Sequence, residues 1–148
     1  EIITSLGTCS SLASLPANIK TSKEMNLSKD ISEVTLPIGA TIHMEGSSIA
    51  SILKIAFLFS IFGRSFTSMS DILIALLVAV LSGVVMSGIP GGGLIGEALI
   101  VSLYGFPTVA FPLISTIGWL IDSPATCLNV VGDIPSTMLI NKLVDNVT

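Results

Sequence analysis

The chain alternates long apolar stretches with short polar connections. A helical bilayer crossing needs about 20 apolar residues, and the stretches 34–62, 72–90 and 94–141 are all long enough. The last of them is long enough to cross, turn and cross again. The pattern therefore predicts an all-α integral membrane protein that begins with a more polar region over residues 1–33.

Composition supports a membrane location. Charged residues make up 11% of the chain and hydrophobic residues 51%, whereas a soluble domain has about a quarter charged residues. The alternative, a soluble α/β core with apolar strands, would have too few charges to cover its surface. Two cysteines and one histidine exclude a disulfide framework and a site of clustered histidines. A net charge of -4 without a basic run indicates no nucleic-acid partner.

The amino-terminal half is expected to hold a polar loop, an amphipathic helix and one membrane segment. Residues 1–16 are rich in Ser and Thr and are expected to form a polar loop that begins in the middle of a longer structure. Residues 17–33 form the helix and a wet connection, and half of the basic residues lie there, which predicts the cytoplasmic side. Residues 34–64 form a transmembrane helix broken by glycines around His43 and Glu45. A Glu at bilayer depth costs about 2.5–3.5 kcal/mol, so it must serve a purpose.

Residues 70–105 are expected to form a re-entrant helical hairpin. The apolar helix stops at SGIPGGG, positions 87–93, because glycine and proline do not continue a helix. Irregular backbone within a membrane survives only when it is buried in protein or lines a wet cavity. The apolar segment 94–104 is too short to span a bilayer, which argues against an ordinary loop in water between two complete spans.

The last span, 107–143, carries the most informative pattern. Asp122, Thr126, Asn129 and Asp133 follow one another at spacings of four, three and four residues, which places them on one stripe of a helix. Two aspartates in an apolar helix are costly, so they must face a partner, an ion or a water-filled site. For Asp133 alone, a capping carboxylate at the cytoplasmic helix end is the alternative.

The polar groups at membrane depth suit binding better than catalysis. His43 has Ser47 one turn away, but the sequence shows no oriented nucleophile–base–acid triad. Carboxylate and carbonyl oxygens suit a hard cation such as sodium, and the positive ends of half-helices suit a substrate carboxylate. The chemistry therefore indicates a cation and a small zwitterion, and it predicts that the protein is not an enzyme.

Four motifs carry a resemblance to a known family. They are TCSSLASLP at 8–16, GATIHMEGS at 39–47, SGIPGGG at 87–93 and DSPATCLNVVGD at 122–133. In this order they resemble the dicarboxylate/amino acid:cation symporter family, which includes glutamate and neutral amino-acid carriers. The resemblance implies an elevator-type transport core in a homotrimer, multi-pass in the plasma (inner) membrane and surrounded by lipid.

The resemblance also assigns the regions of the chain. Residues 1–33 match the descending arm of the first hairpin and a connection, 34–64 a broken transmembrane helix, 70–105 the second re-entrant hairpin, and 107–143 the last transmembrane helix. A scaffold half is expected to be missing from the amino-terminal side. A transport core alone lacks the track along which it moves, so a non-transporting truncated membrane fragment is an alternative.

A substrate site follows from the same resemblance. Asp122 would pair with the substrate amino group, and Asn129 would hold its α-carboxylate. The other implied members line or close the pocket, and they are Ser11, Ser47, Ile89, Gly93 and Thr126. For Ser11 and Ser47, simple small-residue helix packing is the alternative.

Sodium is the implied coupling ion, at two positions. The first would be formed by backbone carbonyls and one carboxylate, from Gly39, His43, Asn129 and Asp133. The second would be formed by carbonyls near Thr41 and from Gly83, Val84 and Met86. A third family site uses an aspartate where this chain has Glu45, one methylene longer. His43 and Glu45 are both titratable at membrane depth, so a proton can replace one sodium.

The substrate class follows from two departures from the family pattern. Members that carry acidic substrates have an arginine three positions after the substrate aspartate, where this chain has Ala125. Cys9 stands where some relatives carry a compensating arginine, and Lys54 lies well along another segment. The resemblance therefore favours sodium-coupled transport of a small neutral amino acid, with a dicarboxylate or acidic amino-acid symporter as the alternative.

Overall fold

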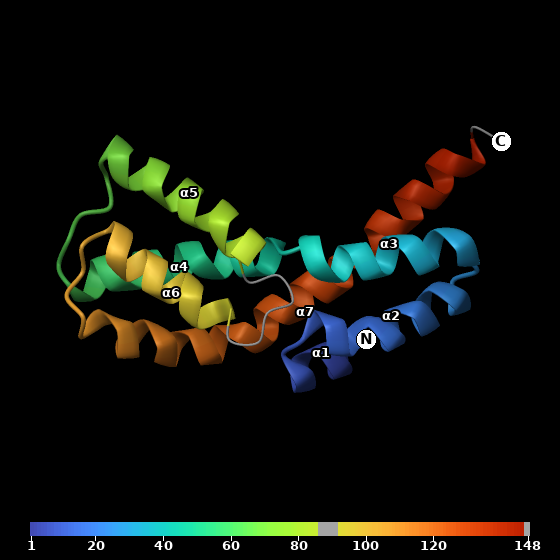
Figure 1. Ribbon diagram of the computed structural model, residues 1–148, viewed down its shortest axis with the longest axis horizontal. Helices are drawn as coiled ribbons and strands as arrows, with labels where there is room; N and C mark the ends of the chain where they lie inside the picture. The colour runs from blue at the N-terminus through green and yellow to red at the C-terminus, as the bar shows by residue number, and fades with distance from the viewer. Residues whose placement is uncertain (86–91, 147–148) are drawn as a thin grey trace.

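A computed structural model describes residues 1–85 and 92–146, and over these ranges the chain is all-helical (Figure 1). The helices are α1 Ile2–Thr8, α2 Ser11–Glu24, α3 Lys29–Ile42, α4 Glu45–Ile61, α5 Met69–Val85, α6 Gly92–Leu103 and α7 Ala110–Asp145. The 36-residue α7 runs along the length of the molecule. Helices α4 and α6 pack on its first half, and α1, α2 and α3 pack farther along it.

The Ser- and Thr-rich start of the chain is helical, so the loop predicted over residues 1–16 is wrong. The Ser10 hydroxyl caps α2 by accepting from the Ala13 N–H at 3.2 Å. Within the helices, the hydroxyls of Ser5 and Ser14 donate to carbonyls three and four residues earlier. Serine hydroxyls can form such hydrogen bonds to the main chain in a helix as well as in a turn. The abundance of serine therefore did not distinguish a helix from a loop.

The membrane segments agree with the predicted pattern in part. Helices α3 and α4 together form the stretch Lys29–Ile61, which is long and apolar enough to cross a membrane, and it is the one such stretch in the part of the chain that the structure describes. Helices α5 and α6 are shorter, apolar and packed together. The residues between them, 86–91, include Met86 and Ile89 and lie outside the described residues. A re-entrant path for this pair stays a prediction.

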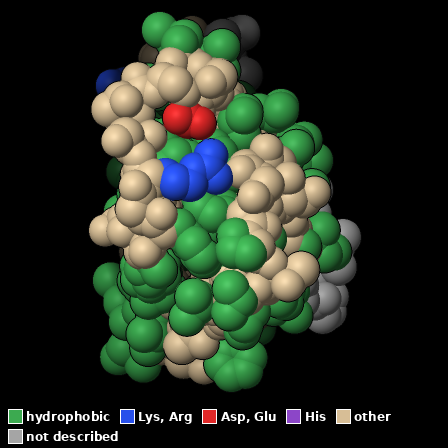
Figure 2. Space-filling view, turned by 90° about the vertical axis from the view of Figure 1, so that its left-hand side faces the viewer, with side chains coloured by type: hydrophobic (Ala, Val, Ile, Leu, Met, Phe, Trp, Pro, Cys, Tyr) green, Lys and Arg blue, Asp and Glu red, His purple; other side chains and the backbone are tan. Residues whose placement is uncertain are grey.

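A hydrophobic cluster lies at the end of the molecule where α4, α5, α6 and α7 meet. Phe59 is at its centre and makes edge contacts with Tyr104 and Phe106. Arg64 closes the cluster, since its guanidinium lies 4.8 Å and 4.7 Å from the ring centres of Phe59 and Phe106 and donates to the Tyr104 carbonyl. Figure 2 looks onto this end and shows a mainly hydrophobic face with basic and acidic groups close together.

The sides of the molecule expose many large apolar residues. Trp119, Leu120 and Ile42 are each more than two-thirds exposed, at 78%, 71% and 72%. An exposed apolar surface of this kind marks contact with lipid or with another protein. It fits the membrane location that the composition predicts.

Candidate ion and substrate site

The break between α3 and α4 lies against the middle of α7. Asn129, 3% exposed, is the residue of α7 that meets the break. Its side-chain oxygen accepts from the Gly46 N–H at 2.8 Å, and its amide nitrogen donates to the Ser47 hydroxyl at 3.1 Å. Gly46 permits this approach, because a Cβ there would overlap the carbonyl oxygen of Ala125. The backbone of α4 therefore touches the backbone of α7 at this point.

Asp133 lies one turn beyond Asn129 and is 2% exposed. Its two carboxylate oxygens have separate partners: the Asn18 amide donates to one at 3.3 Å, and Nδ1 of His43 lies 3.1 Å from the other. Gly39 lies against the same carboxylate, since a Cβ there would overlap it. Three elements, α2, α3 and α7, thus meet at one buried carboxylate.

Glu45 completes this group on the other side of the imidazole. Nε2 of His43 lies 3.1 Å from the Glu45 carboxylate, so each ring nitrogen faces a carboxylate. We call Asn18, His43, Glu45 and Asp133 the His43 cluster. Within the described ranges no three His, Cys, Asp or Glu side chains are arranged to hold a metal ion by themselves. A cation here would need backbone carbonyls as well.

A cavity of about 430 Å³ opens beside the His43 cluster. It lies between the α3–α4 break and the end of α5, and its lining residues are Thr41, Ile42, His43, Met44, Glu45, Ser48, Val80, Gly83 and Val84. The structure therefore brings together the parts of the predicted sodium positions that come from the broken helix and from α5. The Ser48 hydroxyl joins the two helices by donating to the Ala79 carbonyl at 3.1 Å.

The predicted substrate residues are only partly gathered. Thr126 and Asn129 are buried on α7, and Ser47 contacts Asn129 from α4. Asp122 is exposed, so the described residues do not enclose its carboxylate. Two other members lie at helix starts, where Ser11 begins α2 and Gly93 is the second residue of α6.

Comparison with known proteins identifies the family. Residues 1–143 match the Sodium:dicarboxylate symporter family. The chain belongs to this family. Its relatives include neutral amino acid transporter A of Homo sapiens, 36% identical over 131 residues, which are 88% of this chain and 24% of the relative. Neutral amino acid transporter B(0) of Rattus norvegicus is 37% identical over 145 residues, or 97% of this chain and 26% of the relative.

The chain spans about a quarter of the length of these curated relatives and matches a carboxy-terminal portion of them. The matched family is a family of membrane transporters and not of enzymes. The predicted family, a symporter family with amino-acid carriers among its members, is confirmed. Sodium coupling is a property of the family named in the match.

A second buried charged group was missed in the sequence. Nζ of Lys54 on α4 lies 2.8 Å from Glu97 on α6, with the two side chains 7% and 3% exposed. The Ser115 hydroxyl of α7 donates to the other Glu97 oxygen at 2.6 Å. We call Lys54, Glu97 and Ser115 the Lys54 cluster. The available signal was the presence of opposite charges in two apolar segments, since such charges pair inside membranes.

The Lys54 cluster lies closer to the polar stripe than the sequence position of Lys54 suggests. The ion pair packs over Gly118, where a Cβ would overlap Glu97 and lie 3.0 Å from the Lys54 nitrogen. Gly118 is one turn before Asp122, so the ion pair lies within about one helical turn of Asp122 along α7. The first half of α7 therefore has a cation beside it, although that cation is paired.

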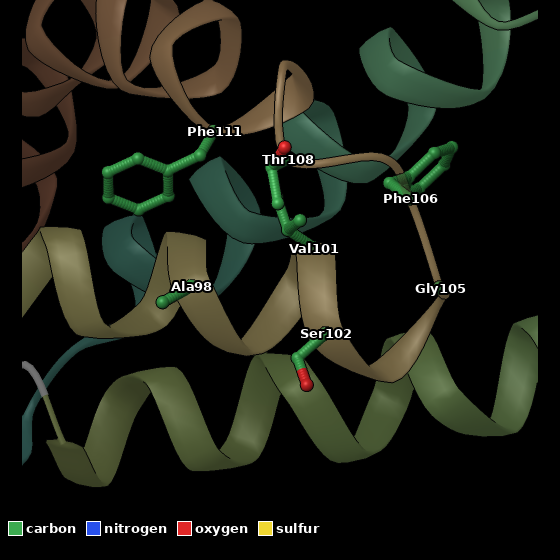
Figure 3. A pocket seen from close by; sticks show the side chains of 7 residues that line it. All are labelled: Ala98, Val101, Ser102, Gly105, Phe106, Thr108 and Phe111. Atoms are coloured by element: carbon green, nitrogen blue, oxygen red, sulfur yellow. The ribbon is translucent and has the colours of Figure 1, made fainter.

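Another cavity, of about 530 Å³, lies between α6 and the start of α7 (Figure 3). It is lined by Ala98, Val101, Ser102, Gly105, Phe106, Thr108 and Phe111. No charged side chain is among these residues, and the Phe106 and Phe111 rings lie at opposite ends of the group. This cavity does not offer the ligands that an ion or a zwitterion needs.

Proposed function

We propose that the chain is the carboxy-terminal transport core of a sodium-coupled symporter for a small neutral amino acid. Two of its relatives are named neutral amino acid transporters. The observation that carries the substrate class is at position 125, where Ala125 is buried and contacts α4 through its carbonyl. No guanidinium projects from this position toward a second substrate carboxylate.

In this proposal the substrate lies along the middle of α7. Asp122 pairs with its ammonium group, and its exposure leaves the carboxylate accessible to a ligand. Asn129 and Thr126 hold the α-carboxylate end, with Ser47 beside them. The remaining proposed contacts come from the hairpin segments, and they are Ser11, Ile89 and Gly93.

Sodium would bind on both sides of the α3–α4 break. Asp133 supplies the carboxylate of the first position, with carbonyls of Gly39, His43 and Asn129. The cavity beside Thr41 and Gly83 supports the second position, because hard cations prefer several oxygen ligands that converge from discontinuous helices. Glu45 lines the same cavity as these groups.

A proton is the alternative coupling ion at the His43 cluster. A neutral imidazole carries one N–H, so with both carboxylates ionised one bare ring nitrogen would face an oxygen of Asp133 or Glu45. One added proton, on the ring or on a carboxyl, gives both contacts a hydrogen bond. Such a proton would take the place of one sodium.

The complete carrier would contain a scaffold half that precedes this chain, form a homotrimer and lie in the plasma membrane. The chain's coverage of about a quarter of its relatives supports the scaffold. The exposed apolar sides fit lipid and scaffold contacts. Two other functions remain as alternatives: a truncated, non-transporting membrane fragment, and a dicarboxylate or acidic amino-acid symporter, which Lys54 against Gly118, one turn before Asp122, would favour.

Uptake by the complete carrier in proteoliposomes tests the proposal. We expect a sodium gradient to drive uptake of labelled serine, alanine or threonine, and aspartate, glutamate and succinate to compete weakly. A second carboxylate left unpaired costs several kcal/mol, and about 1.4 kcal/mol is tenfold, so the preference should reach about a hundredfold. Better uptake of succinate or aspartate than of serine would refute the neutral substrate, and absence of all uptake would refute the transport function.

Two variants locate the substrate within the site. Asp122→Asn should abolish serine uptake in a carrier that still inserts and folds, because the substrate ammonium loses its partner. Ala125→Arg should shift competition toward aspartate, because a guanidinium pairs bidentately with a carboxylate. Near-normal serine affinity in Asp122→Asn would show that this aspartate has a structural role.

A further inference from the structure

The Lys54–Glu97 ion pair has no part in the proposed function, although it is buried next to the proposed site. Its two side chains are almost inaccessible, and the nitrogen–oxygen distance is 2.8 Å. Both oxygens of Glu97 are occupied, one by Lys54 and the other by the Ser115 hydroxyl at 2.6 Å. Burying a lysine and a glutamate among apolar helices costs desolvation free energy, so the pair calls for an explanation.

The pair and the proposed substrate site lie on the same helix faces. Ser47 and Lys54 are seven residues apart on α4, which is about two turns and returns to the same face. Gly118 and Asp122 are four residues apart on α7, or about 6 Å along the axis. The same two helices therefore hold Asn129 against Ser47 at one level and Gly118 against Lys54 at another.

A substrate bound at Asp122 would therefore have a cation within about one helical turn. That cation is not free, because Glu97 neutralises it. The local charge of Lys54, Glu97 and Asp122 is one negative, which matches a substrate that brings an ammonium group and no charged side chain. The second carboxylate of an acidic amino acid would meet two carboxylates and a lysine that is already paired.

We propose that Glu97 is a specificity-determining residue, whose carboxylate occupies Lys54 and so excludes substrates with a second carboxylate. The inference rests on the proposed function, because it takes Asp122 as the site of the substrate ammonium. Glu97 acts through Lys54 and not by touching a neutral substrate. Its carboxylate fills the place beside the lysine that an aspartate or glutamate side chain would need.

The test is competition against labelled serine uptake by the complete carrier in proteoliposomes. In Glu97→Gln the amide keeps the shape of the side chain and releases the charge of Lys54. We expect the inhibition constant for aspartate or glutamate to fall at least tenfold relative to that for alanine. The conservative variant Glu97→Asp keeps the negative charge and should keep acidic substrates excluded, which loss of packing alone would not predict.

A charge-balanced control shows whether the gain depends on the lysine. In Lys54→Gln/Glu97→Gln no cation is released, so the preference for alanine over aspartate should remain as in the unaltered carrier. In Lys54→Arg the ion pair with Glu97 remains, so the buried charge stays compensated. The guanidinium has further N–H groups that do not face Glu97, and these should bind the side-chain carboxylate of aspartate. The second measurement is the melting temperature of the detergent-solubilised protein with and without aspartate. We expect aspartate to raise it for Glu97→Gln and Lys54→Arg only.

The outcomes separate this inference from the proposed function. Serine uptake by the unaltered carrier tests the function alone. If serine is carried and aspartate excluded, but a folded Glu97→Gln carrier binds aspartate no better, Glu97 does not set specificity. If Glu97→Gln does not fold, the same result in Lys54→Arg overturns the inference. An equal gain in Lys54→Gln/Glu97→Gln would overturn it too, because Lys54 would then not be the cation. Strong aspartate competition in the unaltered carrier would refute both.

Discussion

The His43 cluster and the Lys54 cluster both lie along the long helix α7, but they differ in the balance of their buried charges. In the Lys54 cluster one lysine meets one glutamate, and a hydroxyl satisfies the second oxygen. In the His43 cluster two carboxylates meet one imidazole and one amide. The first group is complete without a ligand, whereas the second has an excess of negative charge that a mobile cation or a proton can neutralise.

The two clusters also differ in how accessible they are. A cavity of about 430 Å³ touches His43 and Glu45, so an ion can approach them. The Lys54 pair is closed in by α4, α6 and the Gly118 surface of α7. The His43 cluster is therefore open to a ligand from the cavity, whereas the Lys54 cluster is closed and already compensated.

The largest expected effect comes from breaking the closed pair. Removal of one partner of a buried ion pair costs about 3–5 kcal/mol, whereas replacing both with apolar groups of similar volume is nearly neutral. We expect Glu97→Ala to lower the thermal stability of the purified carrier much more than Lys54→Met/Glu97→Met. Equal losses in the two variants would show that the charges themselves are not what the structure depends on.

The next effect tests the open cluster. Asp133→Asn removes one negative charge but keeps the shape and a hydrogen-bonding group, so folding should persist. We expect at least a tenfold weaker sodium dependence of substrate binding, about 1.4 kcal/mol or more, because hard cations depend on carboxylate ligands. Titration of sodium against substrate binding measures this, with Lys54→Met/Glu97→Met as the variant that should not change it. An unchanged sodium dependence would remove Asp133 from the ion site.

A smaller effect compares the glycines that support the clusters. A Cβ at Gly118 would overlap Glu97, and a Cβ at Gly39 would overlap Asp133, while a Cβ at Gly7 meets no heavy atom within 4 Å. We expect Gly118→Ala and Gly39→Ala each to cost about 1–3 kcal/mol through overpacking. Thermal unfolding in detergent measures the loss, with Gly7→Ala as the matched control. Tolerance of both alanines would mean that the clusters have room that the structure does not show.

The smallest effect is expected at the exposed ion pairs of α2 and α3. Lys20–Glu24 and Lys29–Glu33 lie at 3.8 Å and 3.7 Å, with all four side chains at least half exposed. Such pairs contribute about 0.3–0.5 kcal/mol. Lys29→Ala should therefore leave the melting temperature nearly unchanged in the same assay. A loss as large as that of Glu97→Ala would contradict the distinction between exposed and buried charge.

Local periodicity predicted the features that lie within one helix. The four-three-four spacing placed Asn129 and Asp133 on one face of α7, and both are buried there. The glycines around His43 predicted the break that separates α3 from α4. These predictions succeeded because helix geometry alone determines which side chains share a face.

Contacts between distant segments were beyond reach. Lys54 and Glu97 are 43 residues apart, and Asn18 and Asp133 are 115 apart, so no spacing rule connects them. The helical character of residues 2–8 was missed for another reason, because serine and threonine hydroxyls bond equally well in turns and in helices. Asp122 shares the spacing of the stripe and is nevertheless exposed, since burial depends on which helices pack nearby.

The contact between Gly46 and Ala125 has a consequence for how such a carrier can diverge. Ala125 meets α4 through its main-chain carbonyl and not through its side chain. In the adjoining hydrogen bond to the Asn129 side chain, the donor is likewise a main-chain group, the N–H of Gly46. Under the proposed function, a mutation at position 125 would therefore change the charge offered to the substrate while the helices keep their spacing. Substrate preference would then evolve at this position one residue at a time, without rebuilding the contacts of Asn129.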